Sequence, residues 1–78
     1  MTKQELLGAL IRETREALKL ERAELAPLIH ISPRSLAELE QGNATVRPVV
    51  LMAMECHLRR LRRHADADRF QDQYEARL

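Results

Sequence analysis

The chain contains 78 residues, of which 45% are hydrophobic and 32% are charged, and its formal net charge is +1. This length allows one modest hydrophobic core and excludes a second globular domain, because small chains bury a smaller share of their surface. A charge this close to neutral argues against a strongly basic protein that coats nucleic acid.

The first predicted helix begins at a cap formed by Thr2 and Glu5 and ends before Leu20. In such a capping box, the hydroxyl and the carboxylate each satisfy a free backbone donor of the first turn. Gly8 carries a mild cost, since glycine is a poor helix former. The core face recurs at steps of three and four residues. It contains Leu6, Leu7, Leu10, Ile11, Thr14, Ala17 and Leu18.

Two short helices separated by a turn follow, at residues 21–29 and from Ser32 onward. Pro27 should shorten or bend the first of them, because proline lacks a backbone donor. Ser32 suits the N-cap of the next helix, Pro33 its first position and Gly42 its left-handed C-terminal cap. Two short helices crossing at a turn are the arrangement that holds the second helix in the major groove of DNA. Their predicted core residues are Leu25, Ala26, Ile29, Leu36 and Leu39.

A loop at residues 43–47 leads to a fourth helix, which opens at Pro48 and runs to about Arg63. The first turns of this helix are apolar on all sides. We therefore expect a second surface, most naturally a dimer partner, to cover what the core does not. The predicted core stripe is Leu51, Met54, Leu58 and Leu61.

A last helix is predicted from Asp68, which forms a possible capping pair with Gln71. The only two aromatic residues, Phe70 and Tyr74, lie four apart in it, with Leu78 one turn further. The aromatic side chains either fold back on the core of their own chain or meet their counterparts in another subunit. The dimer interpretation assigns to the interface Val49, Val50, Met52, Ala53, Phe70 and Tyr74.

The predicted fold class is all-α, a compact bundle of about five helices, because no segment alternates at the period of two that is typical of strands. We expect a DNA-binding domain over residues 1–64 and a C-terminal helix or tail, a possible dimerisation element, over residues 65–78. The charge balance is +3 up to Ala65 and −2 from Asp66 onward. The body could therefore face DNA while the acidic end points away.

Residues 10–54 resemble the Cro-like and phage-repressor-like helix-turn-helix family, also called the XRE family. The resemblance is carried by Ile11, Arg12, Arg15, Leu20, Glu24, Leu25, Ala26, Ile29, Ile31, Ser32, Leu36, Leu39, Glu40 and Gly42. The chain departs from the family pattern at Glu21, His30 and Pro33, where a Ser or Thr cap, a small turn residue and a polar residue are usual.

The resemblance implies a lambda-repressor-like helix-turn-helix, a two-fold dimer, and repression by occupation of a promoter-proximal operator. Family members of this size look like phage Cro-like regulators, restriction-modification controllers, antitoxins or small autorepressors of mobile elements. The sequence does not distinguish these subtypes, and it does not identify the operator or the regulated gene.

Nine residues are candidates for contacting DNA: Arg22, Ser32, Pro33, Arg34, Ser35, Glu38, Gln41, Asn43 and Arg47. Arg34 is the best candidate for reading a base, because a guanidinium can bond guanine O6 and N7 together; the alternative is a solvated surface arginine. Glu38 could accept from cytosine N4 or pair with Arg34. The resemblance implies that Arg22 grips a backbone phosphate and that Arg47 approaches a narrow minor groove.

Other charged residues have structural interpretations. The resemblance implies that Glu40 pairs with an arginine of the first helix, either Arg12 or Arg15. The four arginines at positions 59, 60, 62 and 63 could touch flanking DNA. We favour the alternative, in which they lie at the negative end of their helix and pair with Asp66 and Asp68.

No metal site, cofactor or enzymatic activity is predicted. Cys56 and the histidines at 30, 57 and 64 lack the further cysteine or carboxylate that a four-ligand site needs. The chain also has no glycine-rich phosphate loop and no Ser-His-Asp or Cys-His constellation.

The expected location is the cytoplasm of a bacterial or phage-infected cell. A single cysteine fits a reducing compartment, and the first residues lack the apolar stretch of a signal peptide. The longest apolar run, Val49 to Met54, falls far short of the roughly 20 residues that span a membrane.

The leading hypothesis is a homodimeric, sequence-specific repressor whose partner is a double-stranded DNA operator. The competing hypothesis is a protein-interaction module, such as an antitoxin or antirepressor, that binds a second protein.

Overall fold

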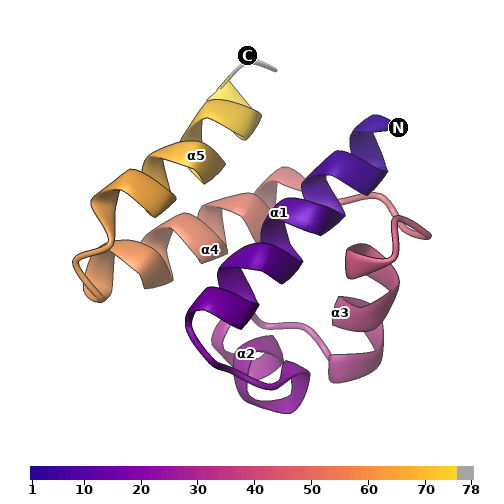
Figure 1. Cartoon of the computed structure of the whole chain (residues 1–78), viewed down its shortest axis with the longest axis horizontal. Coiled ribbons are helices and arrows are strands. Elements are labelled where there is room, and N and C mark those ends of the chain that lie inside the picture. The colour runs from indigo at the N-terminus through magenta and orange to yellow at the C-terminus, as the bar shows by residue number, and fades with distance from the viewer. Residues whose placement is uncertain (76–78) are drawn as a thin grey trace. The chain divides into compact units, whose positions relative to one another are not determined.

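The structure, a computed structural model, describes residues 1–75 of the chain (Figure 1). It contains α1 (Lys3–Ala17), α2 (Arg22–Leu28), α3 (Pro33–Glu40), α4 (Pro48–Arg60) and α5 (His64–Glu75). No strand occurs within the described residues, so the predicted all-α fold with five helices is confirmed. None of these helices is long and apolar enough to cross a membrane.

The helices group into two units. Residues 1–46 contain α1, α2 and α3, and the chain from Arg47 onward contains α4 and α5. The domain boundary expected at residues 64–65 falls inside the second unit, at the first turn of α5. Residues 76–78, the end of the expected C-terminal segment with Leu78, lie outside the described residues.

α1 begins at the predicted capping box. The Glu5 amide donates to Thr2 Oγ1 at 3.2 Å, and the Thr2 amide donates to Glu5 Oε1 at 3.1 Å. The buried stripe is narrower than predicted, since Leu6 is 55% exposed and Ala17 is exposed too. A helix that packs along one face leaves the edges of a wide apolar stripe in solvent. The buried members of the predicted set are Leu7, Leu10, Ile11 and Thr14.

Gly8 lies where α1 packs closely against the end of α3. A Cβ atom at this position would lie 2.1 Å from the carbonyl oxygen of Leu39 and 3.1 Å from that of Glu40. Both neighbours are backbone atoms, so they cannot swing aside as a side chain does. The glycine that costs helix propensity therefore permits the close approach of two helices.

α2 and α3 have the predicted form of two short helices joined by a turn. α2 spans only seven residues and contains Pro27 near its end, as expected for a proline that shortens a helix. α3 starts at Pro33 behind the N-cap Ser32, and α3 packs on both α1 and α2. The loop after α3 is fastened to α1, because the Val46 amide donates to Gln4 Oε1 at 3.1 Å.

The residue that follows the C-cap is left-handed at four helix ends. Gly42 has φ +77, as predicted, and its amide donates to Leu39 O while the Asn43 amide donates to Glu38 O. The same pair of bonds, the Schellman motif, recurs at the ends of α1, α2 and α4. There Lys19, His30 and Arg62 adopt φ near +60. Side chains with a Cβ atom adopt this conformation at a cost of roughly 1 kcal/mol.

α4 and α5 pack against each other as a helical hairpin. Leu51, Met54 and Leu58 of the predicted stripe are buried, but Leu61 is 47% exposed. α4 was expected to reach about Arg63 and ends at Arg60, because the left-handed turn at Arg62 interrupts it. No glycine marks this turn in the sequence.

α5 starts at His64, four residues before the predicted start at Asp68. The Ala67 amide donates to Arg63 O at 2.9 Å, which closes the first turn of the helix before Asp68 is reached. The predicted capping role of Asp68 is therefore wrong. Its carboxylate instead accepts from Arg59 of α4 at 3.0 Å.

Candidate nucleic-acid interface

α3 has two faces of different chemistry. Leu36, Leu39 and Glu40 are buried, while the opposite face consists of exposed polar residues and Pro33. Spacings of three and four residues place the exposed side chains on neighbouring turns of one surface. These exposed candidates are Pro33, Arg34, Ser35 and Glu38. A rigid helix therefore presents donors and acceptors to solvent.

The start of α3 is held by its two serines. Ser32 Oγ accepts from the Ser35 amide at 3.1 Å and donates its own proton to Ser35 Oγ at 3.0 Å. The predicted capping role of Ser32 is confirmed. Because Ser35 Oγ accepts in this pair, its hydroxyl proton can still be donated outward.

Arg34 and Glu38 lie one turn apart, and both are exposed. Within residues 1–75, the structure has no ion pair between them, so the alternative in which Glu38 orients Arg34 is not realised. Arg34 lies in the first turn of α3, and its guanidinium bonds no other side chain of the described residues.

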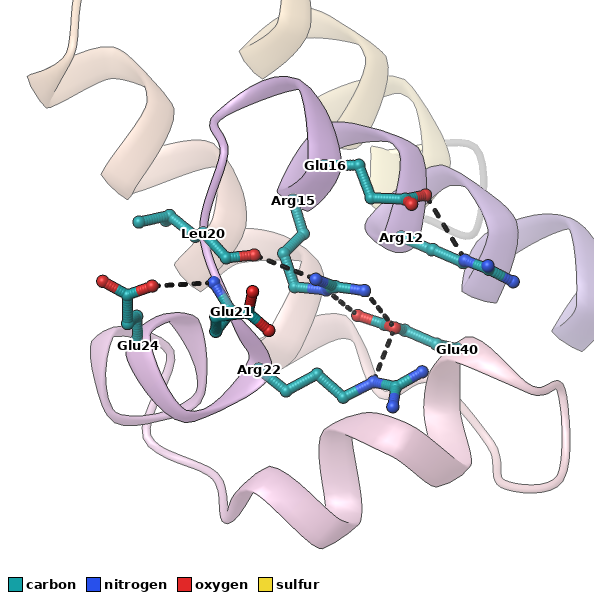
Figure 2. Close-up of polar contacts among 8 residues, drawn as sticks. All are labelled: Arg12, Arg15, Glu16, Leu20, Glu21, Arg22, Glu24 and Glu40. Atoms are coloured by element: carbon teal, nitrogen blue, oxygen red, sulfur yellow. Dashed lines mark hydrogen bonds and ion pairs between the residues drawn. The ribbon is translucent and has the colours of Figure 1, made fainter.

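Glu40 anchors a buried ionic network at the end of α3. Its side chain is 0% exposed and accepts from Arg15 Nε at 2.7 Å, from Arg15 Nη2 at 3.1 Å and from Arg22 Nε at 3.0 Å. Figure 2 shows the two arginines converging on the carboxylate from α1 and α2. Arg15 also donates through Nη1 to the carbonyl oxygen of Leu20 at 2.9 Å. Three segments of the first unit are thus tied to one carboxylate.

Of the two expected partners of Glu40, the structure selects Arg15. The hydrogen bond to Glu40 raises the pKa of the Arg15 guanidinium, outweighing the opposite effect of burial. Arg12 instead forms an exposed pair with Glu16 at 3.3 Å (Figure 2).

The bond from Arg22 to Glu40 was missed by the sequence analysis, which placed Arg22 on a DNA phosphate alone. The two residues are 18 positions apart, and no local spacing rule connects them. The side chain of Arg22 is 40% exposed while that of Glu40 is fully enclosed. Arg22 therefore bridges the buried network and the surface of the first unit.

Gln41 and Asn43 flank the left-handed Gly42. Both side chains are exposed, and Asn43 Nδ2 donates to Gln41 Oε1 at 3.1 Å. This bond holds the two amides beside each other immediately after α3. Arg47 is exposed as well and is the first residue of the second unit.

The residues expected at a dimer interface differ in exposure. Val49 is 66% and Met52 51% exposed, and Ala53 and Tyr74 are partly exposed. Val50 is only 7% exposed and Phe70 is 0% exposed, so these two side chains offer almost no surface to another chain. For Phe70 the structure matches the alternative in which the ring packs inside its own chain.

An open hollow of about 500 Å³ lies on the α4 and α5 hairpin. It is lined by Met52, Glu55, Cys56, Arg59, Arg60 and Tyr74. The Tyr74 hydroxyl donates to Glu55 Oε1, which links the two helices along one side of it.

Two of the four arginines after position 58 form the ion pairs that were predicted. Arg59 donates to Glu55 at 2.9 Å, to Asp68 at 3.0 Å and to Gln71 at 2.8 Å. The bonds to Asp68 and Glu55 raise the pKa of Arg59. Arg63 pairs with Asp66 at 3.0 Å. The predicted pairing with Asp66 and Asp68 is thus confirmed for two of the four arginines, while Arg60 and Arg62 are exposed.

Metal-ligating side chains do not gather in the part of the chain that the structure describes. No three of its His, Cys, Asp and Glu residues come close enough to hold an ion.

A comparison with protein families gives one result that covers most of the interface. The model of a family described as helix-turn-helix domain matches residues 6–54, from α1 into the first half of α4. All nine candidate DNA-contacting positions, from Arg22 to Arg47, lie within the matched residues. No curated protein and no solved structure matches the chain.

Proposed function

The chain belongs to the helix-turn-helix domain family, and from this premise we propose that it is a sequence-specific DNA-binding transcriptional repressor. In this proposal a homodimer binds an inverted-repeat operator, with α3 of each subunit in the major groove of one half-site. The regulator is of the autoregulatory type found in phages and mobile elements.

The observation that carries the proposal is the exposed face of α3. A forked guanidinium, a hydroxyl and a carboxylate project from consecutive turns of a helix whose other face is buried. Arg34 would bond guanine O6 and N7, and Glu38 would accept from a cytosine amino group. Ser35 would donate to a base or a phosphate.

Contacts to the DNA backbone would position this helix. Arg22 offers a partly exposed cation, and Gln41 and Asn43 offer amides at the other end of α3. Arg47 is proposed to approach the minor groove. Such contacts fix orientation and register but carry no sequence information directly.

The second unit supplies the proposed dimer surface. Val49 and Met52 project large apolar side chains into solvent on α4, with Ala53 and Tyr74 partly exposed nearby. Covering them with a second copy would remove apolar surface from water. A two-fold dimer would set the half-sites about 10 base pairs apart, or a multiple of that repeat.

The decisive experiment is selection of bound duplexes from a randomised DNA library at near-physiological salt. The proposal expects an inverted repeat to be enriched, with its two halves separated by the repeat of the duplex. Recovery of no motif, together with weak and strongly salt-dependent binding, would contradict sequence-specific regulation.

Variants then separate base reading from backbone contact on the selected operator. Arg34→Ala should cost about 1–3 kcal/mol of binding free energy and relax the preference at one base pair. Arg22→Ala should weaken binding to all sequences alike and reduce the salt dependence by about one phosphate contact. Equal losses on every sequence for Arg34→Ala would remove its proposed role in reading a base.

A second candidate function is favoured by the exposed side chains of α4. Val49 and Met52 could instead bind a different protein, as an antitoxin or antirepressor does. Mass in solution and salt-dependent duplex binding discriminate between the two functions. A monomer without affinity for duplex DNA would support the protein partner, whereas a dimer that Met52→Glu converts to a monomer would support the repressor.

A further inference from the structure

The bond between Arg22 and Glu40 occupies only one part of the Arg22 guanidinium. Glu40 accepts from Nε at 3.0 Å. A guanidinium carries five donors in a flat fork, and the edge formed by its two terminal nitrogens matches a phosphate. In Figure 2 the line that joins Glu40 to Arg22 ends at Nε and not at either terminal nitrogen. The side chain of Arg22 is 40% exposed, so the arginine that bonds Glu40 also reaches solvent.

The carboxylate that holds Nε is itself fixed. Glu40 is fully enclosed, and Arg15 grips both of its oxygens, at 2.7 Å and 3.1 Å. Arg15 is anchored in turn to the carbonyl oxygen of Leu20 at 2.9 Å. The oxygen that meets Arg22 therefore cannot follow that side chain into solvent, and it limits the conformations of Arg22.

The single negative charge of Glu40 is shared by two arginines, so one positive charge remains uncompensated in this network. The buried pair of Arg15 and Glu40 is neutral as a whole, so Arg22 is the surplus charge of the three-residue network. The nearby Glu24 carboxylate is directed to the backbone amide of Glu21, at 2.9 Å. Arg22 can thus attract an external anion while its orientation is set by Glu40.

We propose that Glu40 is a positioning residue for DNA recognition: it holds Arg22 by Nε so that the terminal nitrogens meet a backbone phosphate as a bidentate fork. This inference rests on the proposed DNA-binding function and assigns Glu40 a role beyond joining α3 to α1. Ordering the long side chain before binding reduces the entropy lost in the complex.

The first test compares two substitutions that each remove one negative charge from α3. Affinity for a random-sequence duplex is measured for Glu40→Gln and for the matched control Glu38→Gln, at a temperature where unfolding curves show both to be folded. Long-range electrostatics alone would tighten binding in both variants. The positioning role predicts that E38Q binds more tightly than the wild type, whereas E40Q binds roughly 3- to 10-fold more weakly.

Coupling to Arg22 identifies the cause of the loss. In an Arg22→Gln background, E40Q should no longer weaken binding, because no fork remains to be positioned. Tighter binding by E40Q in the wild-type background, equal to that of E38Q, would overturn the proposal.

Arg22→Lys keeps the test decisive if E40Q does not fold. Lysine retains the charge but cannot bond Glu40 and present a planar fork together. R22K should therefore bind the duplex more weakly than the wild type although it retains the positive charge, and an R22K with wild-type affinity would overturn the inference. Measuring the wild type first separates the two claims: wild-type protein with no affinity for duplex DNA overturns the proposed function, and the positioning role falls with it.

Discussion

Each of the two units contains a charged side chain shared among several partners, with opposite sign and different burial. In the first unit the Glu40 carboxylate is 0% exposed and accepts from Arg15 and Arg22. In the second, the Arg59 guanidinium is 34% exposed and donates to Glu55, Asp68 and Gln71. The two networks have a similar number of hydrogen bonds. Water screens the charges of the Arg59 network, whereas it is excluded from the Glu40 carboxylate at the centre of the first.

This difference in burial indicates different roles. A buried charge that loses its partner is costly, so the Glu40 network should determine whether α1, α2 and α3 remain together. An exposed ion pair is only slightly more stable than its two side chains in water. The bonds of Arg59 should therefore contribute little to the stability of the hairpin formed by α4 and α5. The buried network also carries its surplus positive charge at Arg22, the side chain proposed to contact a DNA phosphate, whereas the exposed network carries a surplus negative charge.

The largest expected effect comes from breaking the buried network. Arg15→Ala should lower the free energy of unfolding by about 3 kcal/mol, the lower end for a broken buried pair, because Arg22 still meets Glu40. Arg59→Ala, which removes the centre of the exposed network, should cost markedly less. Urea unfolding of both variants measures the difference, and equal losses would show that burial does not separate the two networks.

A second effect concerns the packing that encloses Glu40. Gly8→Ala would normally stabilise a helix by about 1 kcal/mol, but here we expect a loss of about 2 kcal/mol from overpacking against the Leu39 carbonyl. Thermal or urea unfolding measures the sign. Ala17→Gly, at an exposed position of the same helix, calibrates the propensity term, and a stabilised G8A protein would contradict the close approach of α1 and α3.

A smaller change in stability is expected where a side chain other than glycine occupies a left-handed helix end. This change should be the same in both units, because it depends only on local backbone conformation. His30→Gly in the first unit and Arg62→Gly in the second should each stabilise the protein by about 0.5 kcal/mol. Relief of the left-handed strain exceeds the entropy that glycine adds to the unfolded chain. Unfolding curves of the two variants test this, and destabilisation in either would show that the side chain contributes more than its backbone strain costs.

The smallest effect is expected from alkaline pH. The pKa of Arg15 is raised in the folded state, so its contribution is complete below the ordinary guanidinium pKa and is lost only as pH rises through the raised value. The difference in unfolding free energy between wild type and Arg15→Ala should therefore be the same at neutral and at mildly alkaline pH. A difference that shrinks in this range would show that another group titrates in the network.

Much of the first unit followed from local sequence signals. The capping box of Thr2, the N-cap Ser32 and the left-handed Gly42 were all predicted, because each depends on bonds within about five residues. The second unit was predicted less well. Arg62 turns the chain without a glycine, so the early end of α4 and the start of α5 at His64 had no local signal.

The sequence predicted which residue types lie in the candidate interface and in the core, but not which partners they meet or which apolar side chains are covered. Nothing in the spacing of Glu40 distinguished Arg12 from Arg15 or indicated Arg22, since all three are far from it in the chain. Leu6 and Leu61 belong to predicted apolar stripes yet are exposed, whereas Phe70, proposed for an interface, is buried. Whether an apolar side chain is covered depends on neighbours that periodicity does not identify.

The sequence by itself determined about five helices, a helix-turn-helix whose second helix begins behind Ser32, and a polar face on that second helix, because capping, turn conformation and helical spacing are local properties. Tertiary structure alone decided that Gly8 serves close packing and that Arg15 and Arg22 share one buried carboxylate. Those outcomes depend on distances between atoms far apart in the chain, which are fixed only when α1, α2 and α3 exclude water from the space between them.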